Sequence, residues 1–159
     1  MKYLEDIAVG ETYAVGRHTF EVDEIKAFAS RFDPQLFHVD EEAAAASHFG
    51  ALCASGWHTA AIWMRLMVDY RRRLMEQARA RGEPVPSIGP ALGFRELKWS
   101  KPVYVGDTID YSSEVVETRV SESRPGFGLL TICSRGVNQD GDEVLTFLST
   151  TFVERRPQQ

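Results

Sequence analysis

The chain has 159 residues, 43% of them hydrophobic and 26% charged, which is typical of one globular domain with its own core. We therefore expect a single domain over residues 1–159, and the formal net charge of −5 argues against nonspecific binding of nucleic acid. No apolar leader follows Met1 and no uncharged apolar run approaches membrane-spanning length, so a cytoplasmic protein without a membrane partner is expected.

The first third of the chain predicts one strand and two short helices. Residues 11–20 are rich in β-formers and predict the strand. Apolar residues recur at helical spacing over residues 22–32, which predicts the first helix. Asp40 is placed to cap the second helix, over residues 41–47, because two acidic residues follow it in the first turn.

Between these helices lie one carboxylate, Asp33, and one imidazole, His38. Pro34 disfavours helical backbone, so both side chains are expected on an irregular segment with apolar neighbours. Such surroundings suit general acid–base chemistry, because burial and proximity shift the pKa values of both groups. Taken alone the pair is weak evidence, since Asp33 could simply end a helix and His38 could simply pack.

The middle of the chain predicts one long helix over residues 56–79, with Ser55 as its N-cap. The first half of this helix is almost entirely apolar, and the second half is charged. A helix that is apolar on all sides is enclosed by other elements. We therefore expect a sheet to wrap the first half, while the second half extends into solvent.

The remainder of the chain predicts a Gly- and Pro-rich loop followed by strands. The loop is residues 81–90, the strands are residues 91–99, 108–118, 128–138 and 143–154, and the last five residues, 155–159, are expected to fray. Gly141 should supply a positive φ in the last hairpin turn. One strand, a long helix and four further strands predict an α+β fold, an antiparallel sheet wrapped around a central helix.

The cysteines and remaining histidines give no sign of a metal site. Cys53 and Cys133 lie far apart in apolar contexts, which favours buried free thiols over a disulfide. No group of His and Cys has the spacing of metal ligands, so we expect no metal. His18, His48 and His58 receive no catalytic role, and a structural or dimer-contact role is expected for His58.

Three motifs follow one another along the chain. Residues 33–40 read Asp-Pro-Gln-Leu-Phe-His-Val-Asp, residues 54–57 read Ala-Ser-Gly-Trp, and residues 97–108 read Leu-Lys-Trp-Ser-Lys-Pro-Val-Tyr-Val-Gly-Asp-Thr. In order and spacing they resemble the MaoC-like, or (R)-specific, enoyl-CoA hydratase family of hot-dog proteins. The first resembles that family's motif of Asp, any residue, Asn, Pro, any residue and His, although Gln35 and Leu36 replace its Asn and Pro. The second stands where the family often has His-Gly-Met, and the third resembles F-x-x-P-V-x-x-G-D.

The resemblance implies the reversible addition of water to a trans-2-enoyl-CoA, giving a 3-hydroxyacyl-CoA. The coenzyme A thioester would be the substrate, and no separate cofactor is expected. Asp33 and His38 would activate the water, and the backbone N–H of Gly56, at the positive end of the long helix, would bind the thioester oxygen. The expected substrate-binding residues are Ser55, Trp57 and Gln35.

The resemblance also implies a homodimer or higher homo-oligomer whose active sites lie near the shared interface. Basic residues near the mouth of the site would then bind the phosphates of coenzyme A. The candidates are Arg95, Lys98, Lys101 and Arg124.

Two alternative functions remain open. A hot-dog acyl-CoA thioesterase would need a carboxylate on or near the central helix, where Asp69 and Glu76 lie only in the solvated half. A non-catalytic acyl-CoA-binding module would have kept the fold and lost the alignment of its groups, and the altered Gln35-Leu36 pair motivates that reading.

Overall fold

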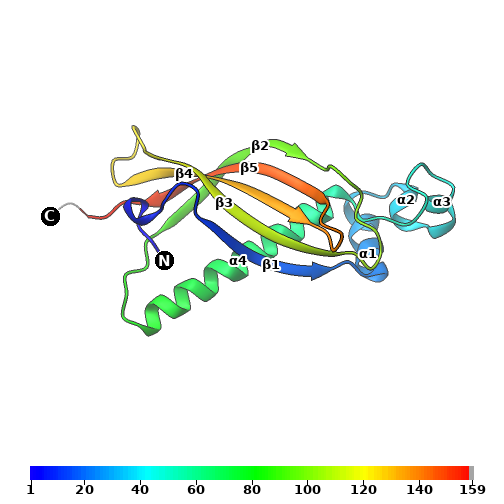
Figure 1. Ribbon diagram of the computed structural model, residues 1–159, viewed down its shortest axis with the longest axis horizontal. Helices are drawn as coiled ribbons and strands as arrows, with labels where there is room; N and C mark the ends of the chain where they lie inside the picture. Colours follow the sequence, from blue (N-terminus) through cyan, green and yellow to red (C-terminus); the bar gives the residue numbers. More distant parts are fainter. Residues whose placement is uncertain (158–159) are drawn as a thin grey trace.

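The computed structural model describes residues 1–157 and contains a five-stranded antiparallel sheet that curves over one long helix (Figure 1). The strands are β1 (Thr12–Thr19), β2 (Ile88–Lys98), β3 (Thr108–Val120), β4 (Phe127–Val137) and β5 (Glu143–Glu154). Their order in the sheet is β1-β3-β4-β5-β2, which leaves β1 and β2 at the edges. The helices are η1 (Leu4–Asp6), α1 (Val22–Phe32), α2 (Leu36–Val39), α3 (Glu41–Ala45) and α4 (Gly56–Ala80). This arrangement confirms the predicted layout of a sheet wrapped around a central helix.

Helix α1 has the predicted bounds, and its two ends are fixed by local chemistry. At its start the Glu21 side chain accepts a hydrogen bond from the third helical N–H, while the Glu24 side chain accepts one from the Glu21 N–H. At its end the Asp33 N–H still donates to the Ala29 carbonyl at 2.8 Å. The helix stops there because the ring of Pro34 disfavours helical backbone at Asp33.

The segment after α1 differs from the prediction. His38 lies on the single helical turn α2, so irregular backbone is correct for Asp33 and wrong for His38. The proline restricts only the residue before it, and the Asp40 N–H closes the turn by donating to the Leu36 carbonyl at 2.9 Å. Asp40 also caps α3, as predicted, because its side chain accepts from the Ala43 N–H at 2.8 Å.

Helix α4 begins at Gly56 after the predicted N-cap, Ser55, and ends at Ala80. Its buried side chains are His58, Thr59, Trp63, Met67 and Ala78. The predicted enclosure of its first half is wrong on another side of the helix. Three large apolar side chains there are 43–56% exposed, namely Trp57, Met64 and Val68. The sheet of a single chain covers only one side of the helix, which is why this stripe faces outward.

Strand β2 starts three residues earlier than predicted and includes Gly89 and Pro90. Proline is tolerated there because β2 is an edge strand, paired on one side only with β5. The other strands lie within three residues of the predicted bounds, and Gly141 has the expected positive φ, 84°.

The described part of the C-terminal tail is held in place. Arg155 pairs with Glu5 at 3.1 Å and Arg156 with Asp6 at 2.7 Å, so the predicted fraying is wrong for these residues. The last two positions of that prediction, 158 and 159, lie outside the described residues. None of the helices formed by residues 1–157 has both the length and the apolar character needed to span a membrane.

Candidate active site

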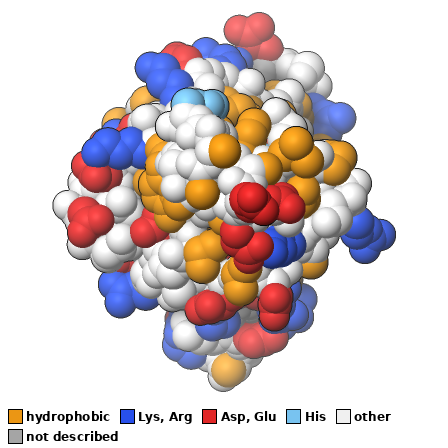
Figure 2. Space-filling view, turned by 90° about the vertical axis from the view of Figure 1, so that its right-hand side faces the viewer, with side chains coloured by type: hydrophobic (Ala, Val, Ile, Leu, Met, Phe, Trp, Pro, Cys, Tyr) orange, Lys and Arg blue, Asp and Glu red, His pale blue; other side chains and the backbone are white. Residues whose placement is uncertain are grey.

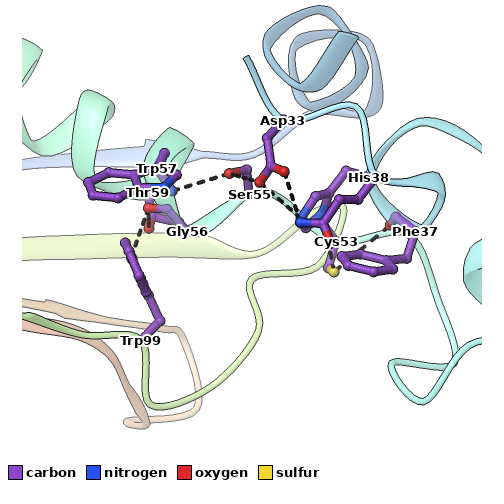
Figure 3. A network of polar contacts seen from close by, with 10 residues as sticks. Asp33, Phe37, His38, Cys53, Ser55, Gly56, Trp57, Thr59 and Trp99 are labelled. Atoms are coloured by element: carbon purple, nitrogen blue, oxygen red, sulfur yellow. Dashed lines mark hydrogen bonds and ion pairs between the residues drawn. The ribbon is translucent and has the colours of Figure 1, made fainter. Parts of the chain in front are cut away.

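Asp33, His38 and Ser55 converge from three different elements (Figure 3). Asp33 follows α1, His38 lies on α2, and Ser55 precedes α4. The Ser55 hydroxyl donates to Oδ2 of Asp33 at 2.6 Å, and Nε2 of His38 lies 3.5 Å from the same oxygen. The other oxygen, Oδ1, accepts a hydrogen bond from the Gln35 amide at 2.8 Å. The fold thus brings together a carboxylate and an imidazole that are five positions apart in the sequence.

The orientation of the His38 ring is fixed by the backbone of Cys53. Nδ1 of His38 lies 2.7 Å from the Cys53 carbonyl oxygen, and a carbonyl can only accept, so Nδ1 carries the proton. The other nitrogen, Nε2, therefore faces Asp33. Cys53 is itself held by a β-bridge to Tyr104, which ties this contact to the rest of the fold.

The surroundings of Asp33 keep its carboxylate ionised. Burial by itself would raise the pKa of Asp33, but the hydrogen bonds from Ser55 and Gln35 and the nearby His38 outweigh it. The net result is a pKa of Asp33 below its ordinary value. At neutral pH this side chain is an anion that accepts hydrogen bonds through both oxygens.

Ser55 was expected to contact substrate, but its side chain is completely buried. Its hydroxyl donates to Asp33 and accepts from the Trp57 N–H at 3.2 Å, which makes it the N-cap of α4 as well. The Ser55 side chain therefore links the start of the long helix to the carboxylate of Asp33. Asp33 lines the pocket, whereas Ser55 lies behind it.

Gly56, at the first position of α4, leaves its N–H without an acceptor among residues 1–157. Its carbonyl accepts from the Thr59 hydroxyl at 2.6 Å and from the Trp99 indole N–H at 2.8 Å. A Cβ added to Gly56 would lie 2.6 Å from the Trp99 ring. Close packing of the Trp99 indole thus leaves no room for a larger residue at this position.

Trp99 is the residue of this site that sequence reasoning missed. It follows the last residue of β2 and lies edge-on to Trp57, with ring centroids 5.0 Å apart. Its contact with Gly56 joins positions 43 residues apart, which no local pattern reveals. The only sequence signal was its position as the aromatic residue of the third motif.

These groups line a pocket of about 500 Å³. Gln35 and Trp57, both expected to bind substrate, lie in its wall together with Asp33, His38 and Gly56. Its apolar lining includes Phe37, Phe49 and Val103. The pocket thus offers an apolar surface beside one carboxylate, one imidazole and the free N–H at the start of α4.

The four basic candidates for phosphate binding lie in different places. Lys101 lines the pocket and pairs with Asp142 at 2.7 Å. Arg124 is in the turn between β3 and β4, 4.8 Å from the centre of the Phe152 ring, at the end of the sheet away from α2 (Figure 1). Its expected place near the mouth of the site is therefore wrong. Arg95 and Lys98 are exposed on β2 and are not part of the pocket wall described above.

Of the remaining histidines and cysteines, Cys53 orients the His38 ring through its backbone, while His58 and Cys133 do not contact Asp33 or His38. His58 is buried, stacked on Phe28 with ring centroids 4.6 Å apart, and burial lowers its pKa below the ordinary value. Cys53 is a buried free thiol as expected, whereas Cys133 is only partly buried. Within the described range 1–157, no three His, Cys, Asp or Glu residues are grouped as metal ligands would be.

Figure 2 views the molecule from the end that carries α2 and α3. Apolar side chains on this face are interspersed with acidic and basic ones, and neither sign of charge forms a continuous field. A face of this kind lacks the basic stripe that a nucleic-acid surface requires.

Comparisons with known proteins agree with the observed fold. Residues 7–128 match the family model described as MaoC like domain. A MaoC-like dehydratase from Rhodospirillum rubrum is 41% identical in sequence, has a TM-score of 0.81, and is matched over 99% of this chain and 100% of its own. Protein YdeM of Bacillus subtilis is 29% identical over 96% of this chain and 99% of its own. Mesaconyl-CoA hydratase of Cereibacter sphaeroides is 34% identical over 47% of this chain, which is 23% of that longer protein. The chain therefore belongs to the MaoC-like domain family and has the hot-dog fold of its dehydratase members.

Proposed function

We propose that this chain is a hydratase–dehydratase that adds water reversibly to the double bond of a trans-2-enoyl-CoA, giving a 3-hydroxyacyl-CoA. The observation that carries the proposal is the pair of Asp33 and His38, whose facing atoms lie 3.5 Å apart at a pocket. The similarity to a MaoC-like dehydratase supports the reaction class. Similarity to part of a mesaconyl-CoA hydratase supports a coenzyme A thioester as substrate.

The distance between Asp33 and His38 suits a shared water molecule. At 3.5 Å, Nε2 and Oδ2 are too far apart for a good direct hydrogen bond, yet close enough for one water to contact both. In a neutral His38 ring whose single proton is on Nδ1, Nε2 is an acceptor, and the ionised carboxylate of Asp33 is another. A water held there donates one hydrogen to each group, which leaves its oxygen lone pairs free to attack.

The reaction then needs one bond made at each end of the double bond. The water oxygen attacks Cβ of the enoyl group, and its released proton is accepted by the Asp33–His38 pair. As charge develops on the thioester oxygen, the free N–H of Gly56 donates to it from the positive end of α4. The pair returns the proton to Cα, which completes the 3-hydroxyacyl product without any change of oxidation state overall.

Three neighbours position these groups. Ser55 and Gln35 each donate to one oxygen of Asp33 and hold the carboxylate toward His38. Trp99 binds the Gly56 carbonyl and so fixes the peptide at the start of α4. Trp57, edge-on to Trp99, contributes an apolar wall against which the acyl group packs.

The thioesterase alternative finds no carboxylate of the central helix in the pocket wall. Asp69 on α4 is engaged by Arg72 at 2.7 Å and by Arg65 at 3.3 Å, away from the pocket wall. One assay separates the three functions, namely incubation with crotonyl-CoA and with butyryl-CoA. Our proposal predicts loss of the enoyl absorbance with crotonyl-CoA and no free thiol with either compound. Release of thiol would identify a thioesterase, and binding without any reaction would identify an acyl-CoA-binding module.

We also propose that two copies pair along the uncovered side of α4. The exposed stripe of Trp57, Met64 and Val68 lies on that helix, and Leu92 and Phe94 are exposed on edge strand β2. An unpaired edge and an apolar helix face are both features that proteins commonly cover by two-fold pairing. Because Trp57 belongs to both the stripe and the pocket wall, the partner would complete the pocket beside it.

A further inference from the structure

A second cavity, of about 250 Å³, lies between the C-terminal half of α4 and the sheet. Its walls come from α4, from the N-terminal segment and from all five strands. Its apolar lining includes Met67, Ile88, Val115, Leu130 and Val153. These elements meet at the end of the molecule away from α2 and α3 (Figure 1). The cavity shares no lining residue with the pocket of Asp33 and His38, so the two are separate.

One charged side chain in this cavity lacks a partner. Arg71 lines it from α4, and among residues 1–157 its guanidinium has neither an acidic partner nor a hydrogen bond. Two other arginines of the same helix, Arg65 and Arg72, both bind Asp69. Burial lowers the pKa of Arg71 below its ordinary value, although a guanidinium remains charged at neutral pH. A cation partly withdrawn from water without a counterion is costly, and an anionic ligand would remove that cost.

Two tyrosines beside Arg71 add neutral donors and a flat apolar surface. Tyr13 and Tyr70 stack with ring centroids 5.1 Å apart and both line the cavity. Burial raises the pKa of each above the ordinary value, so both phenols keep their protons at neutral pH. Lys2 and Glu11, which also line the cavity, pair with each other at 2.7 Å. Their charges cancel, which leaves Arg71 as the uncompensated side-chain charge of the lining.

We propose that this cavity is a second ligand site and that it binds a small amphiphilic monocarboxylate. The carboxylate pairs with Arg71, because a guanidinium presents two parallel N–H donors that match two carboxylate oxygens. The hydrocarbon part lies against the apolar wall that Met67 and Val153 help to form. Arg71 is fifteen residues from Gly56 along α4, roughly 22 Å at the rise of an α-helix, so a ligand there is distant from the Asp33–His38 pair. The inference does not depend on the proposed hydratase activity.

The methionines of the chain provide probes for this site. Met67 lines the cavity, whereas Met64, one turn earlier on the same helix, is exposed outside it. We would label the methionine methyl groups with ¹³C, titrate the whole protein with octanoate, and follow both methyl signals by NMR. The expected result is a saturable shift of the Met67 signal with no comparable shift at Met64. 1-Octanol, which has the same chain without the charge, should bind at least ten times more weakly.

Two variants with the same change in net charge complete the test. Arg71→Gln should weaken octanoate binding at least tenfold, whereas Arg73→Gln, at an exposed position of the same helix, should leave it unchanged. An unmoved Met67 signal at saturating octanoate would overturn the proposal. Equal binding of octanoate and 1-octanol by the wild-type chain would also overturn it, and this comparison needs no folded variant.

Discussion

His38 Nδ1 lies 2.7 Å from the carbonyl oxygen of Cys53, and this contact sets which nitrogen of the ring faces Asp33. Because the acceptor belongs to the backbone, it is unaffected by the identity of the Cys53 side chain. The Cys53 thiol lies 3.7 Å from the same nitrogen, and burial raises the pKa of Cys53 to about 11. A thiol with that pKa stays protonated at neutral pH and is a poor nucleophile.

Replacing Cys53 by alanine should therefore leave the activity nearly intact. Cys53→Ala keeps the carbonyl that orients His38 and removes only the neutral thiol, so we expect kcat within about threefold of the wild-type value, since the thiolate fraction is small. The measurement is steady-state hydration of crotonyl-CoA. A loss of a hundredfold or more would mean that the sulfur itself takes part in the reaction.

Replacing Ser55 should change the pH dependence of the activity. Ser55→Ala removes a hydrogen bond that lowers the pKa of Asp33, while the burial that raises it remains. Catalysis needs the ionised carboxylate, so activity falls as pH drops through this pKa, and the acid limb of the pH profile should move to higher pH in the variant. Ser55→Thr keeps the hydroxyl and should restore the wild-type limb. An unshifted acid limb in Ser55→Ala would show that Ser55 does not lower the pKa of Asp33 during catalysis.

The lowered pKa of Asp33 also contributes to the free energy of unfolding. The pKa of Asp33 is lower in the folded state than in the unfolded state. The ionised carboxylate therefore stabilises the fold above its ordinary pKa, and this contribution is lost as pH falls through the lowered value. Ser55→Ala also loses the cap of α4, which typically costs about 1 kcal/mol. Chemical denaturation at neutral and acidic pH should show the difference between wild type and variant shrinking toward acidic pH.

The hydrogen bond from Trp99 should hold the backbone at the start of α4 in the position that catalysis needs. Trp99→Phe keeps an aromatic ring in the pocket wall and removes the N–H that binds the Gly56 carbonyl. We expect a fall in kcat of about fivefold, with KM little changed, because roughly 1 kcal/mol of hydrogen bonding is lost at the Gly56 carbonyl, in the peptide next to the one whose N–H donates to the thioester oxygen. Trp57→Phe is the matched control, since the donors to the Gly56 carbonyl are Thr59 and Trp99, and the Trp57 indole only packs edge-on against Trp99. A rise in KM alone would instead assign Trp99 to substrate packing.

The assembly can be tested on the exposed stripe of α4. Met64→Glu places a charge among the apolar side chains that we expect a second copy to cover, so it should shift the chain toward monomer. Analytical ultracentrifugation at micromolar concentration measures this, with Arg73→Glu, at an exposed position outside the stripe, as control. A wild-type chain that sediments as a fully active monomer would contradict the pairing model.

The sequence predicted what depends on local spacing. Helical periodicity and the break at Pro34 placed α1 at its observed bounds, and alternation with turn residues placed four strands within three positions. The motif around Asp33 and His38 also singled out two side chains that the structure brings together at a pocket. Each of these features depends on residues that are close together in the sequence, which is why the sequence alone predicts it.

What the sequence missed depends on contacts between distant positions. The hydrogen bonds of Ser55 with Asp33 and of Trp99 with Gly56 join segments that only the folded sheet and helices bring together. The outward stripe on α4 was missed for a related reason, since composition indicates that a helix is apolar but not which of its sides another element covers.

The most direct test is the hydration of crotonyl-CoA by the wild-type chain and by Asp33→Asn and His38→Ala. Asp40→Asn is the matched control, because Asp40 is a nearby carboxylate that caps α3, and asparagine caps equally well. We expect each of the first two changes to lower kcat by at least about 100-fold in a chain that still folds, while the control stays near wild type. Near-normal turnover in both Asp33→Asn and His38→Ala would contradict the proposed function.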